Sequence, residues 1–160
     1  MSFNWTKVVV YALGIAAALI VYFLILNALG LGGTIYMSFF NAFITAGGMY
    51  MMIRALFKDE GKNFEYINGF LAATAAGFIS TIAFTVFMAV YLVEINPELA
   101  KEIATKITTI KGTGELSILL FIALSGFATT LVAALGIMPI FKQSWNTRQV
   151  REAQKPMNQK

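Results

Sequence analysis

The side chains that could do chemistry within the apolar parts of this chain are amides and hydroxyls, not ionised groups. Asn41 and Thr45 stand four residues apart, and Ser80 and Thr85 lie in a second apolar stretch. Residues four apart share one face of a helix, so Asn41 and Thr45 would point the same way. Such groups could line a narrow path for a small polar solute, or could hydrogen-bond within and between helices. Both interpretations stay open, and these four residues form a candidate polar path.

The residue types on which most catalytic and metal sites depend are missing from the sequence. Its 160 residues include no cysteine and no histidine, which excludes thiolate nucleophiles, cysteine-bound metals and imidazole bases. Glu94, Glu98 and Glu102 could attract a cation, but their spacing with interleaved lysines is typical of a solvated helix face. No phosphate-binding loop occurs either. We therefore expect no catalytic residue, no cofactor and no metal site, and hence a protein that is not an enzyme.

Long uncharged stretches place the polar groups in membrane-spanning helices. Charged residues make up only 12% of the chain, about half their share in a soluble domain. Residues 8–53 carry no charge and would extend roughly 69 Å as one helix, against about 30 Å of hydrocarbon. The chain must therefore turn back, and the glycine-rich residues 30–33 are the expected turn. Two further uncharged runs cover residues 66–93 and 116–141.

These runs predict an all-α integral membrane protein, a four-helix bundle formed by residues 1–141. Its transmembrane helices are expected at about residues 6–29, 34–57, 66–94 and 116–141. Residues 142–160 form a basic tail. Lysine and arginine number nine on the side that holds both termini and three on the other side. Positive loops face the cytoplasm, so we expect a multi-pass protein of the cytoplasmic (inner) membrane with both termini cytoplasmic.

A fifth, amphipathic helix is predicted at about residues 97–111, between the third and fourth transmembrane helices. Asn96 can cap its first turn, and Leu99, Ile103 and Ile107 recur every four residues on its apolar face. This helix could lie on the membrane surface as a connector. Alternatively, the three apolar residues could dock a partner.

Small residues repeat every four positions along the third helix. They are Gly69, Ala73, Gly77 and Thr81. Comparable pairs occur in the other helices, among them Gly14 with Ala18 and Gly126 with Thr130. Such stripes let helix backbones approach closely in lipid. They predict the contacts that close the bundle, although the third helix could instead face another subunit.

Three sequence features share a likeness with a known group of proteins. They are the charged loop at residues 58–62 followed by Phe64-Glu65-Tyr66, the small-residue helix after it, and Ile95-Asn96-Pro97-Glu98-Leu99. With these features the chain resembles a family of small inner-membrane proteins of unknown function that is common in Bacteroidota. The resemblance implies four helices with this loop arrangement. It brings no activity and no catalytic residues.

These observations together favour a non-enzymatic accessory or scaffold subunit of a larger membrane assembly. Its expected partners are the lipid bilayer and other membrane protein subunits or further copies of itself, with no nucleic acid. The alternative is a small oligomeric channel or transporter that uses the candidate polar path.

Overall fold

The computed structural model describes residues 5–61, 64–107 and 115–142, and within these residues every regular element is a helix. Five α-helices follow one another along the chain. They are α1 (Trp5–Ala28), α2 (Phe39–Glu60), α3 (Tyr66–Val90), α4 (Pro97–Ile107) and α5 (Glu115–Ile137). Three short segments complete the described chain: 3₁₀ turns at η1 (Ile35–Ser38) and η4 (Met138–Phe141), and a π-helical turn at η3 (Tyr91–Ile95). The predicted basic tail lies outside the described residues, apart from Lys142.

Three of the helical stretches are long and apolar enough to cross a membrane. They are Trp5–Ala28, Tyr66–Ile95 and Leu116–Phe141, with 24, 30 and 26 residues. At about 1.5 Å per residue, each exceeds the ~30 Å of hydrocarbon. The 22 residues of α2 are less apolar, because they include Asn41, Arg54 and the charged end from Lys58 to Glu60. The composition and helix lengths therefore fit a multi-pass membrane protein.

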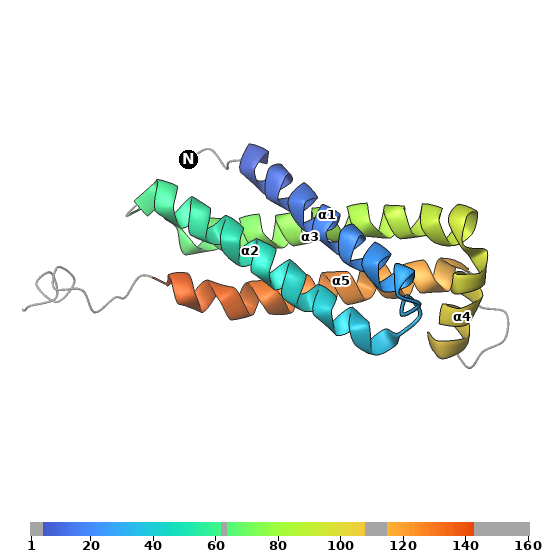
Figure 1. Cartoon of the computed structure of the whole chain (residues 1–160). Helices are drawn as coiled ribbons and strands as arrows, with labels where there is room; N and C mark the ends of the chain where they lie inside the picture. The colour runs from blue at the N-terminus through green and yellow to red at the C-terminus, as the bar shows by residue number, and fades with distance from the viewer. Residues whose placement is uncertain (1–4, 62–63, 108–114, 143–160) are drawn as a thin grey trace, which may run out of the picture.

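The long helices pack side by side in an antiparallel order. Helix α1 contacts α2 and α3, and α5 contacts the same two helices from the other side. In Figure 1 the start of α1, the end of α2, the start of α3 and the end of α5 lie at one end, here called the terminal end. The opposite end carries α4, which crosses the long helices steeply, and is called the α4 end. An ion pair between Lys7 and Asp59 joins α1 to α2 at the terminal end.

The turn between α1 and α2 lies in the glycine-rich segment where the sequence predicts it. Gly30 has a φ of +74°, a left-handed conformation that glycine adopts without a Cβ clash. The Leu31 N–H donates to the Leu26 carbonyl at 2.8 Å and the Gly30 N–H to the Asn27 carbonyl at 3.0 Å. This pattern closes a helix C-terminus. The chain then passes through η1, so α2 begins at residue 39, five residues later than expected.

Two other predicted boundaries are also met. The Leu99 N–H donates to Asn96 Oδ1 at 3.1 Å, which confirms Asn96 as the cap of α4. The third predicted helix reaches residue 95, but its last turn is π-helical, with the Asn96 N–H bonded to the Tyr91 carbonyl at 2.8 Å. Sequence patterning does not reveal such a turn. The end of the predicted helix at residues 108–111 lies outside the described residues.

The interior is filled by apolar side chains, and so is most of the surface. Met49, Met52, Ile53 and Met138 are completely buried. Large apolar side chains also face outward along every long helix, for example Val10, Leu24, Phe43, Leu71 and Val132, each more than 40% exposed. A water-soluble domain rarely exposes so much contiguous apolar surface. Hydrocarbon is the solvent that such a surface suits.

Candidate functional site

The small-residue stripe of α3 meets a matching stripe on α5 halfway along the two helices. A Cβ added to Gly77 would lie 2.6 Å from Thr130 Oγ1, and one added to Gly126 would lie 2.9 Å from Thr81 Oγ1. Each threonine therefore fills the notch left by a glycine of the opposite helix. We call these four residues the Gly–Thr seam. Their i, i+4 spacing on both helices allows two reciprocal contacts at one crossing.

The other stripe residues of α3 are also buried against neighbours. Gly69 lies under the ring of Phe64 and close to Met138, and Ala73 is fully buried. On α2, Gly48 accommodates Ile15 of α1 in the same way. The prediction is wrong for Gly14 and Ala18, because both are exposed on the outer side of α1. Helix α1 packs inward through Val8, Ala12, Ile15, Ala16, Leu19 and Phe23 instead.

Hydroxyl groups of the candidate polar path bond to the backbone of their own helix. The Ser80 hydroxyl donates to the Gly77 carbonyl at 2.8 Å, and the Thr85 hydroxyl donates to the Thr81 carbonyl at 2.8 Å. Thr45 is buried within α2, while Asn41 stands in the first turn of that helix. Asn41 thus lies near the α4 end and not at mid-helix. The four residues are spread over different levels of two helices.

Two buried oxygen atoms of the seam region and of α2 lack a hydrogen-bond partner among the described residues. These are Thr130 Oγ1 and Asn41 Oδ1. An unsatisfied polar group buried in an apolar setting costs free energy, on the order of 1–3 kcal/mol. Both atoms are therefore positions where a further polar group would be favourable.

At the α4 end, the glycine turn and the start of α4 enclose a polar pocket of about 220 Å³. Its walls are Asn27, Gly30, Gly32, Gly33, Asn96, Glu98, Leu99 and Glu102. The carboxylate of Glu102 lies against the backbone of Gly33, where no larger residue would fit. Glu98 forms an exposed ion pair with Lys101 at 3.0 Å. The described residues contain no group of three acidic, histidine or cysteine side chains placed to hold a metal ion.

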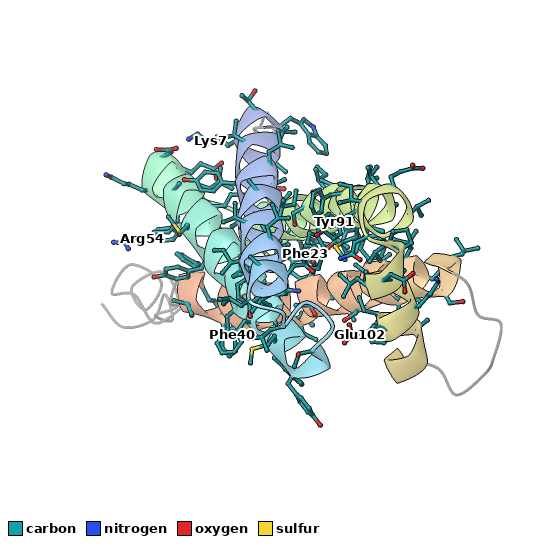
Figure 2. All side chains as sticks on the ribbon, turned by 45° about the vertical axis from the view of Figure 1, so that its right-hand side comes forward. Lys7, Phe23, Phe40, Arg54, Tyr91 and Glu102 are labelled. Carbon is teal, nitrogen blue, oxygen red and sulfur yellow. The ribbon has the colours of Figure 1, made fainter. Side chains whose placement is uncertain are left out.

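One hydrogen bond ties the end of α1 to the π-helical turn behind this pocket. Asn27 Nδ2 donates to the Tyr91 hydroxyl at 2.8 Å, and the Tyr91 ring packs edge-on against Phe23 with centroids 5.1 Å apart. Figure 2 shows Phe23 and Tyr91 next to each other beside α1. Sequence reasoning treats Tyr91 only as an interfacial aromatic residue and passes over Asn27. An amide at the end of an apolar helix is the signal that would have indicated the bond.

Removing that hydroxyl should weaken the α4 end measurably. For Tyr91→Phe we expect a loss of about 1 kcal/mol in the free energy of unfolding, because Asn27 loses its acceptor while the ring contacts persist. Denaturant titration in detergent micelles, followed by circular dichroism, measures the change. Tyr36→Phe is the matched control, since Tyr36 is 79% exposed. Equal stability of both variants would contradict a structural role for the bond.

The predicted docking residues of α4 differ in how far they are available to a partner. Leu99 is buried and Ile103 is partly buried against the core, where α4 packs on α5 and η3. The side chain of Ile107 lies outside the described residues. In this structure the inner half of the apolar face of α4 is therefore covered by the chain itself.

Comparison with known proteins adds no relative to this picture, because the chain matches no protein-family model, no curated protein and no solved structure. The likeness to the Bacteroidota membrane family stays a prediction from the sequence. The functional argument depends on the geometry of the chain itself.

Proposed function

We propose that this chain is a non-enzymatic accessory or scaffold subunit of a larger membrane assembly. In this proposal α1, α2, α3 and α5 all cross the membrane, and both termini lie in the cytoplasm. The amphipathic α4 lies at the opposite surface. The basic count of the loops and the shared position of the start of α1 and the end of α5 support this orientation.

The observation that carries the proposal is the use of the interior polar groups. Thr81 and Thr130 fill glycine notches, while the hydroxyls of Ser80 and Thr85 bond to their own helices. Donors used in this way are not free to replace the hydration shell of a passing solute. Transport proteins in general place ionisable groups in a cavity between their helices, whereas Arg54 is exposed on the outer side of α2.

The channel or transporter alternative is favoured by two atoms. Asn41 Oδ1 and Thr130 Oγ1 have no partner among the described residues and could accept hydrogen bonds from a solute or from a second subunit. They stand on different helices, α2 and α5. An oligomeric pore would have to bring such atoms from several copies around one axis.

Flux through the purified protein separates the two functions. We expect no glycerol or potassium flux above that of empty liposomes, and no change when Asn41 and Thr45 are both replaced by leucine. Stopped-flow light scattering and a potassium electrode measure these fluxes. A flux that disappears in the double variant, while the oligomer persists, would establish the channel and reject the scaffold.

Purification in a mild detergent tests the accessory role directly. We expect other membrane chains to remain bound at a fixed stoichiometry, which quantitative mass spectrometry of the purified complex reports. A homogeneous oligomer of this chain without other subunits would contradict the proposal and favour the channel.

A further inference from the structure

The outward face of α2 combines an apolar column with two cations at one end. The face consists of Phe40, Phe43, Gly47, Met51, Arg54 and Lys58, whose spacings of three and four residues place them in one row. All six are exposed. Phe43 is 73% exposed and Met51 63%, so the apolar part of the row has no covering helix. The cations stand in the last two turns, at the terminal end.

Arg54 and Lys58 differ from the other cations for which the structure gives a partner. Lys7 pairs with Asp59, and Lys101 pairs with Glu98. Arg54 and Lys58 form no ion pair with any carboxylate in the described residues. Figure 2 shows Arg54 directed away from the packed helices. The row therefore ends in two adjacent positive charges, about one helical turn apart, that face outward.

The middle of the row contains an open position. A Cβ added to Gly47 would meet nothing within 4 Å, although its neighbour Gly48 is filled by Ile15 of α1. Gly47 therefore forms a low point between the exposed side chains of Phe43 and Met51. From Phe43 to Arg54 the row extends over roughly 16 Å, at ~1.5 Å per residue. A lipid acyl chain has a comparable length.

We propose that this face binds one anionic phospholipid, with its phosphate on Arg54 and Lys58 and an acyl chain lying over Gly47. A guanidinium can donate two parallel hydrogen bonds to a phosphate, and a neighbouring ammonium adds a further charge. The apolar row below supplies the surface that an acyl chain covers. The inference rests on α2 crossing the membrane, as in the proposed function, because only then does the row run from the interface into the hydrocarbon.

Native mass spectrometry of the purified chain measures the retained lipid. The probes are phosphatidylglycerol and phosphatidylcholine with identical acyl chains, added in equal amounts to the detergent-solubilised protein. We expect the wild-type chain to retain phosphatidylglycerol preferentially, and Arg54→Gln to lower that retention about fivefold, as expected for one cation near a lipid phosphate. Arg54→Lys should keep most of the retention, because the charge persists.

Two matched variants separate the site from general charge and surface effects. Lys101→Gln removes an exposed cation at the α4 end and should change nothing. Gly47→Leu should lower retention of the phospholipid, whereas Gly14→Leu, at an equally open glycine of α1, should not. Equal losses in Arg54→Gln and Lys101→Gln, or equal retention of the two lipids by the wild-type chain, would overturn the proposal.

Further outcomes assign the face to a different occupant or test α2 alone. If Arg54→Gln and Gly47→Leu dissociate an oligomer and leave lipid retention unchanged, the face is a contact between copies and the lipid site is rejected. Cysteine labelling reports separately whether α2 crosses the membrane. A crossing α2 without lipid selectivity would reject the site and leave the proposed topology intact.

Discussion

Gly77→Ala is expected to lower the free energy of unfolding by about 1–3 kcal/mol, the usual cost of forcing extra volume into a packed interior. The added methyl group would meet Thr130 at distances that real Cβ atoms do not adopt, so α3 and α5 would have to move apart. Gly126→Ala should have a similar effect through Thr81 on the other half of the seam. Unfolding in micelles by a denaturing detergent, followed by circular dichroism, measures both.

Gly47→Ala provides the matched control for the seam. It makes the same chemical change within a helix, at a glycine with open space around it. Since alanine has the higher helix propensity, this variant should be neutral or slightly more stable. Adding Thr130→Ala to Gly77→Ala should recover part of the lost stability, because it removes the atoms that the new methyl group meets. If Gly77→Ala were as stable as Gly47→Ala, the close approach of α3 and α5 would be disproved.

A single-cysteine scan is expected to divide the chain into two all-or-none labelling classes. The sequence has no cysteine, so each introduced thiol reports alone. In oriented membranes, a charged, membrane-impermeant maleimide should label Leu29→Cys and Glu98→Cys from one side. Lys58→Cys and Lys142→Cys should be labelled only from the other side. All four wild-type side chains are exposed, and they lie at the two opposite ends of the long helices.

Lys58→Cys is the decisive position in this scan. Helix α2 is the long helix that is not apolar enough by composition to be counted with the three clear spans. If α2 crosses, residues 29 and 58 are labelled from opposite sides. Labelling of both from the same side would show that α2 does not cross, and it would remove the four-crossing topology together with the lipid site.

Much of the helix pattern follows from the sequence, because it depends on local chemistry. The uncharged runs predict α1, α3 and α5 to within a few residues, since a chain in hydrocarbon must satisfy its backbone groups within each helix. The turn at Gly30 and the cap at Asn96 are equally local, because each depends on the conformational or hydrogen-bonding preference of one residue.

The candidate sites were less predictable. The α3 stripe through Gly77 and Thr81 is buried as expected, whereas the same small-residue pattern at Gly14 and Ala18 is exposed. Both patterns permit a close approach, but neither states which neighbour uses it. The π-helical turn and the bond from Asn27 to Tyr91 also have no sequence signature, because they join residues that are 64 positions apart.

The sequence by itself determined that this protein is helical, that its long helices suit hydrocarbon, and that it lacks the histidine and cysteine chemistry of many enzymes. These properties depend on composition and on short-range order along the chain. Only the tertiary structure decided which glycines receive a neighbouring side chain, that the hydroxyls of Ser80 and Thr85 bond to their own helices, and that Arg54 points outward. The physical reason is that an apolar helix is similar on all sides, so its orientation is fixed by the shapes of the helices packed against it.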